Sequence, residues 1–253
     1  MAVNTRNSIV TNGLVLALDA GNTKSYVSGS TTWFDISRNS PNITLTQTTY
    51  DSVNGGNIIF QGSSSTSYGT LAHSDAYAPT GNNSSMEVWV KFNFLDYNTN
   101  SGSLMWFFRK DNPDSLSPNK GVYFSYDNRT NQSSFAYICF GNTAGGFSGG
   151  GNNFAEAIYR QTFTTGSWNY IAYSISNSTG SFFINGIQKG PSKVFNNLNM
   201  YSTLNSSFGI TANNVAAPST PFNIASFKIY NRGLSPQEVL QNYNTTKTRF
   251  GLT

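Results

Sequence analysis

The sequence predicts an all-β fold: a sandwich or jelly roll of two antiparallel sheets, with one short helix near the C-terminus. Short strand patterns recur along the chain, separated by turns rich in Asn, Ser and Gly, and this spacing is typical of sandwiches and jelly rolls. A helical pattern is clear only after residue 234. Since β-sandwiches of 253 residues are common, we expect one domain over residues 13–253, preceded by a polar arm at 1–12.

The clearest strand is predicted over residues 222–230, where β-branched and aromatic residues are frequent. Phe227 and Ile229 fall on one face and Lys228 and Tyr230 on the other, because successive side chains of a strand alternate. Asn, Arg and Gly at 231–233 indicate a turn that ends this strand.

A helix is predicted directly after that turn. Ser235 is followed by Pro236 and, three residues on, by Glu238, the pattern of a capping box with proline at the first helical position. Val239, Leu240 and Tyr243 would then form its apolar stripe.

Further strands follow from the same patterns. Leu, Val and Ala at residues 14–18 indicate a strand covered on both faces. Residues 86–92 alternate, so Met86 and Val88 should face inward while Glu87, Trp89 and Lys91 face out. Shorter strands are expected at residues 43–45, 57–60, 68–71, 104–109, 121–126, 134–140, 168–175 and 207–212, and a hairpin is expected at 181–188.

Four segments carry a resemblance to a known family. They are GLVLALDAGNTKSY at 13–26, TTWFDIS at 31–37, the pair WNYIA and FFING at 168–172 and 182–186, and the C-terminal IASFKIYNRGLSPQEVLQNY. Together they resemble laminin-G-like jelly rolls of the concanavalin A-like lectin/glucanase superfamily, most like those in structural proteins of tailed bacteriophages. The resemblance implies the fold and that the N-terminal strand lies beside the C-terminal one. The resemblance predicts the function less well, because proteins with this fold have several different functions.

The resemblance implies a non-enzymatic structural protein on the virion surface of a tailed phage, in the capsid decoration, neck or tail. Its partners would be other virion proteins and host-surface polysaccharide, and it would be a homo-oligomer or attached to a symmetric particle. The alternative is a purely structural subunit that contacts other virion proteins and binds no sugar. A second alternative is a glycoside hydrolase of the glucanase branch.

The acidic residues argue against a hydrolase. Glucanases of this fold carry alternating carboxylates on one strand, as acid and nucleophile. The three glutamates, Glu87, Glu156 and Glu238, each lack an acidic residue two positions away. A Ser-His-Asp site would need His73, the only histidine, whose neighbours Ser74 and Asp75 are adjacent in sequence rather than suitably spaced.

A sugar site would need an exposed aromatic ring surrounded by polar groups. The candidates on strands are Trp89, Trp106, Tyr126 and Tyr137. The glycine-rich loop after residue 140 would form the rim, through Phe147, Asn152 and Asn153. Against this, 15% of the chain is aromatic and most of these rings must be core, with Trp33 and Trp168 at family positions that are structural.

Calcium is the one cofactor that the resemblance implies, at the rim of the sandwich. Asp19, Asn22 and Asp35 would supply the hard oxygen ligands that Ca²⁺ prefers. The alternative is that these side chains cap turns through their own hydrogen bonds.

Charge and hydropathy limit the partners further. The net charge is +4, but the basic residues are scattered, so we expect no nucleic-acid partner. No stretch approaches the ~18 apolar residues of a membrane span, and the first residues have no apolar signal-peptide core. We therefore expect synthesis in the host cytoplasm and no insertion into a membrane.

Overall fold

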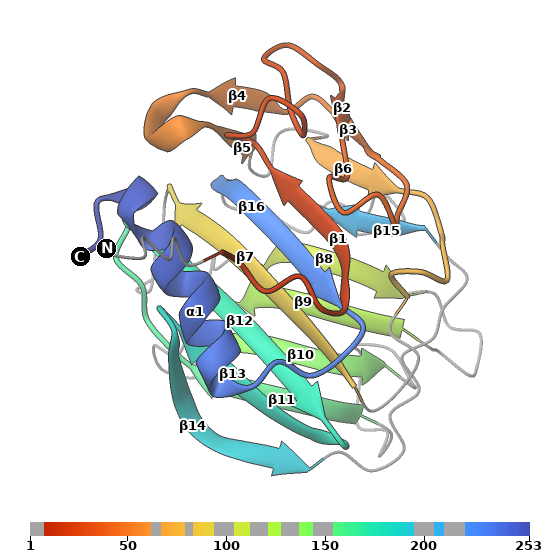
Figure 1. Cartoon of the computed structure of the whole chain (residues 1–253), viewed down its shortest axis with the longest axis vertical. Helices are drawn as coiled ribbons and strands as arrows, with labels where there is room; N and C mark the ends of the chain where they lie inside the picture. The colour runs from red at the N-terminus through yellow and green to blue at the C-terminus, as the bar shows by residue number, and fades with distance from the viewer. Residues whose placement is uncertain are drawn as a thin grey trace, which may run out of the picture.

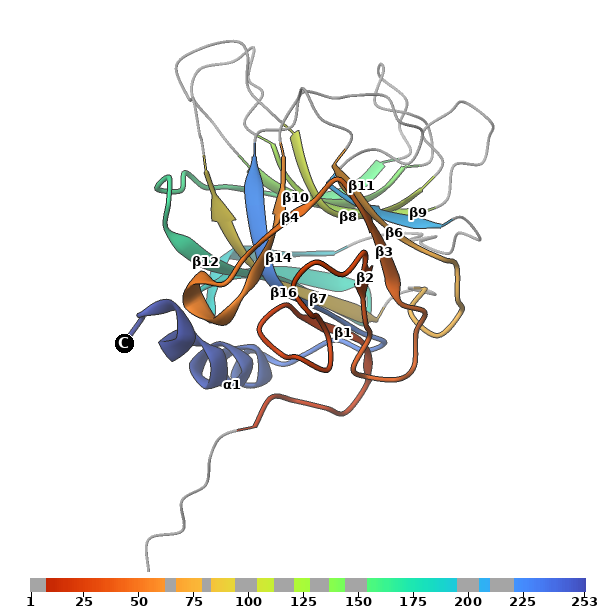
Figure 2. The same ribbon diagram turned by 90° about the horizontal axis from the view of Figure 1, so that it is seen from above.

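The computed structural model describes residues 8–61, 67–78, 83–93, 104–111, 121–127, 137–143, 154–194, 205–209 and 221–253. Within these residues, two antiparallel sheets of eight strands each pack face to face. The single α-helix of this part lies outside the first sheet, so that Figure 2 shows three layers: helix, sheet A and sheet B. The predicted two-sheet antiparallel sandwich is confirmed.

Sheet A has the order β14-β13-β12-β7-β16-β5-β4, with β1 also paired to β16. Its strands are β1 (Leu14–Asp19), β4 (Thr49–Asp51), β5 (Asn57–Phe60), β7 (Ser84–Phe92), β12 (Trp168–Ser176), β13 (Thr179–Ile184), β14 (Ile187–Val194) and β16 (Phe222–Tyr230). Figure 1 shows β4 and β14 at opposite ends of the molecule.

Sheet B has the order β11-β10-β9-β8-β15-β6-β3-β2. Its strands are β2 (Thr32–Trp33), β3 (Ile43–Thr46), β6 (Tyr68–Leu71), β8 (Leu104–Asp111), β9 (Gly121–Asp127), β10 (Tyr137–Thr143), β11 (Phe154–Arg160) and β15 (Ser206–Phe208). Helix α1 (Pro236–Thr246) and two 3₁₀ helices, η1 (Val53–Gly55) and η2 (Lys247–Phe250), complete the described elements. The sequence patterns did not reveal β2, β4 and β11.

Strand β16 organises sheet A. On one side it pairs with β7 along its whole length; on the other it pairs with β5 at residues 222–224 and then with β1 at 226–230. A bulge between Ile224 and Ser226 lies where one partner replaces the other, and the Ala20 amide donates to the Ala225 carbonyl there (2.9 Å). The expected neighbourhood of the N-terminal and C-terminal strands is confirmed.

The main core fills the space between the sheets. Met86, Val88, Val90 and Phe92 of β7 are buried there, as their alternation predicts. Trp33 is also fully buried in this core, so the structural interpretation of that residue holds.

A second apolar cluster covers the outer face of sheet A. Trp89 stacks on Phe250 of η2 with ring centroids 4.1 Å apart, and Trp168 packs on the same ring at 4.8 Å. Glu87 and Trp89 face out of the sandwich as predicted, yet each is only 1% exposed. Alternation correctly assigned them to the second face, but α1 and η2 cover that face.

Helix α1 begins as predicted. The Ser235 hydroxyl accepts from the Glu238 amide (3.2 Å) and the Glu238 carboxylate accepts from the Ser235 amide (2.9 Å), which completes the capping box. The predicted apolar stripe is partly wrong, because Leu240 is 41% exposed while Asn242 is fully buried beside Val239.

A buried polar network explains why an asparagine occupies the inner face of α1. The Asn242 amide group donates to Glu87 (2.7 Å) and to the Tyr230 hydroxyl (3.0 Å), and its carbonyl oxygen accepts from the Val10 amide (2.7 Å). Lys228 lies 3.5 Å from the other oxygen of Glu87. The end of the expected N-terminal arm is thereby fixed onto the helix, and Val10 is buried.

This network also affects acid–base equilibria. Burial, followed by the negative charge of Glu87, raises the pKa of the Tyr170 hydroxyl well above its ordinary value.

The described residues contain no helix with the length and apolar character needed to cross a bilayer.

Candidate functional site

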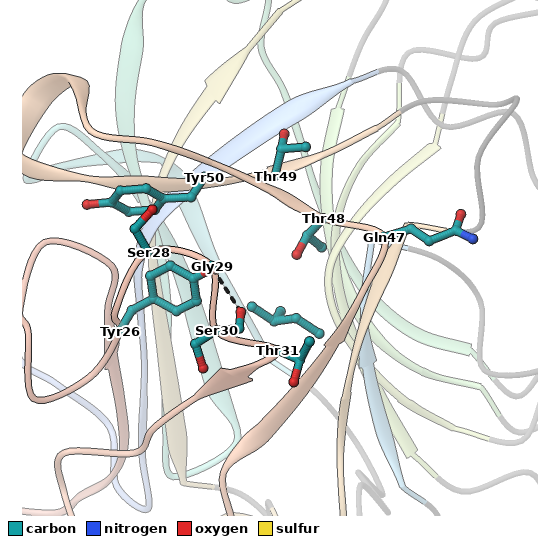
Figure 3. A pocket seen from close by; sticks show the side chains of 10 residues that line it. Tyr26, Ser28, Gly29, Ser30, Thr31, Gln47, Thr48, Thr49 and Tyr50 are labelled. Atoms are coloured by element: carbon teal, nitrogen blue, oxygen red, sulfur yellow. Dashed lines mark hydrogen bonds between the residues drawn. The ribbon is translucent and has the colours of Figure 1, made fainter.

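A pocket of about 340 Å³ opens at one edge of the sandwich, where the edge strand β4 of sheet A approaches the edge of sheet B (Figure 3). The chain crosses from sheet B to sheet A at this place, since β3 and β4 are consecutive but belong to different sheets. The described lining residues come from the segment before β2 and from the end of β3 through β4: Tyr26, Ser28, Gly29, Ser30, Thr31, Leu45, Gln47, Thr48, Thr49 and Tyr50.

Two tyrosines form one side of the pocket. The ring centroids of Tyr26 and Tyr50 lie 5.2 Å apart at an interplanar angle of 34°. The Tyr26 hydroxyl donates to the Ser30 carbonyl (2.9 Å) and so closes the short loop between them. Burial raises the pKa of Tyr26 above its ordinary value.

Hydroxyl groups form much of the remaining wall. The side chains of Ser28, Thr31 and Thr48 make no hydrogen bond to another described residue, so their hydroxyls can bond to a ligand or to water. Figure 3 shows Gln47 and Thr48 on the side of the pocket opposite the two tyrosines. Gln47 has a φ of +49°, a left-handed conformation that turns the chain between the two sheets.

None of the described lining residues carries a charge. Tyr26 is only 6% exposed, so the accessible aromatic surface comes mainly from the half-buried Tyr50 ring. The pocket therefore offers part of an aromatic ring, hydroxyl groups and one amide, but no general acid, base or carboxylate nucleophile. A neutral, hydroxyl-rich ligand suits this chemistry, because it can exchange hydrogen bonds with such groups while an apolar face packs on the rings.

Three of the aromatic residues expected to bind sugar are instead buried. Trp89 lies under η2 and donates through Nε1 to Thr246 Oγ1 (2.8 Å). Tyr126 lies in the main core and donates to the Gln161 carbonyl (3.0 Å). Trp106 is 1% exposed, with the Arg109 guanidinium 4.6 Å from its ring centroid. The expectation of an exposed aromatic plate made by these rings is wrong.

The other predicted sugar-contact residues are not placed by the structure. Tyr137 belongs to β10, but its side chain lies outside the described part of the chain, as do Phe147, Asn152 and Asn153 entirely. A role for these four residues stays a prediction.

The residues expected to hold calcium cap turns. Both oxygens of Asp35 accept hydrogen bonds: Oδ1 from the amides of Ala17 (2.8 Å) and Ser37 (2.9 Å), and Oδ2 from the Ser37 hydroxyl (2.7 Å) and the amides of Asn39 (3.1 Å) and Ser40 (3.0 Å). These N–H and O–H donors occupy the lone pairs that a cation would need.

The second acidic candidate has a similar environment. Asp19 accepts from the Gly21 amide (2.9 Å) and from the Arg249 guanidinium (2.6 Å), a positive group that opposes a nearby cation. Asn22 accepts from the Lys24 amide (3.0 Å). Among the described residues, no three His, Cys, Asp or Glu side chains group in a way that could hold a metal ion. This arrangement does not fit Ca²⁺ and favours the turn-capping interpretation.

The only histidine lies beside a buried lysine. His73 Nδ1 is 2.9 Å from Lys110 Nζ, and His73 Nε2 is 3.3 Å from Asp75. Burial lowers the pKa of Lys110 to about 8, against a smaller opposing effect of Asp75. A hydrolytic triad would have a serine hydroxyl at the position that the lysine amine occupies.

Sequence reasoning missed the tyrosine pocket. A signal exists in the two segments YVSGSTT (26–32) and TQTTY (46–50), each with a tyrosine at one end of a run of hydroxyl residues. Runs of Ser and Thr are common in this chain. These two are distinguished only because they meet where the chain crosses between the sheets.

Solved structures similar to this chain include binding domains of clostridial toxins. The chain is similar to the binding domain of Paraclostridial Mosquitocidal Protein 1, with 16% identity, a TM-score of 0.66, and coverage of 93% of this chain and 52% of that one. It is also similar to the receptor-binding domain of botulinum neurotoxin type G, with 14% identity, a TM-score of 0.63, and coverage of 92% and 51%.

A third similar structure is the ligand-binding domain of botulinum neurotoxin serotype D in complex with N-acetylneuraminic acid. It has 14% identity, a TM-score of 0.64, and coverage of 95% of this chain and 52% of that one. The chain thus spans about half the length of these structures, and at such identities the likeness establishes the fold alone. No curated protein sequence matches the chain.

A family model matches residues 62–240, which include strands of both sheets and the start of α1. The resemblance inferred from the sequence motifs and the two-sheet architecture agree with this match. The chain belongs to the concanavalin A-like lectin/glucanases superfamily.

Proposed function

We propose that the protein is a non-enzymatic lectin-like module that binds neutral saccharide units in the pocket beside Tyr26 and Tyr50. The observation that carries this proposal is the composition of the pocket: two tyrosine rings and several hydroxyl side chains, with no charge among the described lining residues. The family and the jelly-roll fold are compatible with it, since lectins occur on this fold.

A hydrolase is the weaker proposal. Glu87 is buried under α1 in contact with Asn242 and Lys228, and Glu238 is engaged in a capping box and an ion pair with Arg232. Neither carboxylate faces the tyrosine pocket, and hydrolysis of a glycosidic bond by the usual mechanism needs two carboxyl groups across that bond.

The serotype D toxin structure with N-acetylneuraminic acid supports sugar binding only by analogy. The matched region is about half of that domain, so the sugar need not contact the half that this chain resembles. The proposal therefore rests on the residues of this chain rather than on that complex.

We place the module on the surface of a tailed-phage virion, in the capsid decoration, neck or tail. This placement is supported by the resemblance of the sequence motifs to phage structural proteins. A single open pocket without charged groups among its described lining residues should bind sugar in the millimolar range. Many copies on a symmetric particle would raise the avidity by roughly 10² to 10⁴. A homo-oligomer or an attached array therefore suits this function better than a free monomer.

The binding proposal can be tested on a glycan array with the protein displayed in many copies. Ser28→Trp adds a ring at the exposed rim of the pocket and should remove binding to neutral glycans, without altering the core. Thr248→Trp, an equally exposed substitution on η2, is the matched control and should bind as wild type. Equal binding by both variants, or no binding by wild type, would contradict the proposal.

The virion placement needs a separate experiment. Particles that lack the protein should lose adsorption to host polysaccharide if it is a surface lectin. If such particles adsorb normally but lose physical stability, the purely structural alternative is correct.

A further inference from the structure

A second pocket lies at the opposite edge of the sandwich. It has a volume of about 400 Å³ and is lined by Tyr159 of β11 together with residues of β13 and β14: Gly180, Phe182, Lys189, Gly190, Pro191, Ser192, Lys193 and Val194. Strand β14 is the edge of sheet A and β11 the edge of sheet B, and both lie at the far end of their sheets from β4 and β2. This volume is within the range of small-molecule sites.

The register places two lysines on the inner side of the edge strand. Phe182 pairs with Lys189, and Gly180 pairs with Lys193. Directly paired residues of an antiparallel sheet point to the same face, and Phe182 packs in the core between the sheets. Lys189 and Lys193 therefore extend from the face of β14 that is turned toward sheet B.

A bulge shapes the pocket between these lysines. One residue of β13, Ser181, lies opposite three residues of β14 at 190–192. Gly190 has a φ of +67°, and a Cβ atom built there would lie 3.1 Å from the Tyr159 ring. Only glycine suits this conformation and this close approach, so the bulged backbone lies directly against the ring.

The charged side chains among the described lining residues of this pocket, Lys189 and Lys193, are both positive. No Asp or Glu is among its described lining residues, although Glu156 belongs to the same strand, β11, as Tyr159. Among the described residues, no carboxylate forms an ion pair with Lys189. Lys189 is half-buried, and its partial removal from water strengthens its interaction with an anion.

We propose that this pocket binds a carboxylate-bearing sugar residue, with Lys189 and Lys193 at the carboxylate and Tyr159 against the sugar ring. The site is independent of the neutral-sugar pocket, because the two share no residue and lie at opposite edges. The Ser192 hydroxyl, already 2.7 Å from Ser181 Oγ, adds a hydrogen-bonding group at the bulge. Together they give this module one site for neutral and one for acidic units of a polysaccharide.

A competing explanation is that the lysines only protect an edge strand. Inward lysines, a proline and a bulge all discourage edge-to-edge pairing, and β14 has each of them. That explanation requires charged side chains on the edge strand but no ligand, and it holds for side chains of either charge.

The test is titration calorimetry with trigalacturonate, and with its methyl ester as the probe that lacks the negative charge. Wild type should bind the acid and not the ester, and binding should weaken as salt is raised. Lys189→Gln with Lys193→Gln should weaken binding by at least about tenfold, since two charge-assisted hydrogen bonds are lost. The control pair Lys24→Gln with Arg38→Gln removes the same charge from exposed positions elsewhere and should leave binding unchanged.

Charge reversal separates the two explanations. Lys189→Glu with Lys193→Glu keeps the edge charged, so the strand stays protected, but it should abolish trigalacturonate binding. Ser28→Trp should have no effect on this binding, so failure of the neutral-sugar proposal and failure of this one are distinguishable. Three results would overturn the inference: no binding by wild type, equal binding of the ester, or equal loss in the control pair.

Discussion

At the scale of single residues, Asn242 joins more parts of the molecule than its helical position suggests. It contacts Glu87 of β7, Tyr230 of β16 and the backbone of Val10, and all of these groups are buried. A buried carboxylate is tolerated only with hydrogen bonds and opposite charge, here from Asn242 and Lys228. The position of α1 therefore depends on one amide side chain as well as on its apolar contacts.

Replacing Asn242 with alanine should lower the free energy of unfolding by about 2 to 4 kcal/mol, because Glu87 and the Val10 amide would lose a buried partner. Asn244→Ala, at an exposed position of the same helix, should change it by less than about 0.5 kcal/mol. Urea denaturation of both variants measures the difference. Similar values for the two would mean that the network contributes little to stability.

Glu238 should give the protein a specific acid sensitivity. The hydrogen bond from Arg232 is the main cause that lowers the pKa of this carboxyl from 4.5 to about 2, opposed by desolvation. Because the folded-state pKa is lowered, the stabilisation is present above about pH 4.5 and is lost as the pH falls toward 2.

The variant Glu238→Gln keeps a capping side chain but loses the ion pair. It should be about 1 kcal/mol less stable than wild type at about pH 6, a modest value because the pair is partly solvated. The difference between the two proteins should shrink as the pH is lowered to about 2. A difference that stays constant over this range would show that the carboxylate charge is not responsible.

At the scale of elements, β16 has partners on both sides, and its outer face supports α1. Removing residues 222–253 would leave β7, β5 and β1 with unpaired edges and would expose the apolar cluster around Trp89. We expect no cooperative thermal transition in this truncated chain. Removing only 247–253 should retain the transition at a lower temperature, because η2 contributes the Phe250 ring but no strand. A full-length melting temperature in the longer deletion would contradict the central role of β16.

The elements with strong local signals were predictable. Alternation identified β7 and β16, and the Ser-Pro-x-Glu pattern identified α1 with its cap. The burial of Glu87 and Trp89 was not predictable from alternation, because it depends on where a later helix packs. Leu240 and Asn242 were misjudged for the same reason. Which face of the helix is buried depends on the sheet residues it packs against, here the buried polar groups of Glu87 and Tyr230.

The short strands and the tyrosine pocket were beyond local patterns. Strands β2 and β4 have two and three residues, too few to show a period. The pocket needs residues 26–31 and 45–50 to meet where the chain crosses between sheets, which is a property of topology. In a sequence rich in Ser, Thr and Tyr, the residues alone do not distinguish these segments from others.

At the scale of the whole molecule, the stability of the sandwich should not depend on a metal. The carboxylates of Asp19 and Asp35 are already satisfied by backbone, hydroxyl and guanidinium donors. We therefore expect the melting temperature to be the same with added calcium and with excess EDTA. A lower melting temperature in EDTA that calcium restores would establish a site that stabilises the fold, and would revive the calcium hypothesis.

The central claim is that a neutral sugar binds at the tyrosine edge of the sandwich, and NMR titration of the ¹⁵N-labelled protein tests it most directly. A neutral oligosaccharide identified on the array should shift the amide signals of residues 26–31 and 45–50, with saturation in the millimolar range. The Ser28→Trp variant should show no such shifts, while Thr248→Trp should reproduce them. Absence of saturable shifts in these two segments, or saturable shifts only elsewhere on the molecule, would contradict the proposed binding site.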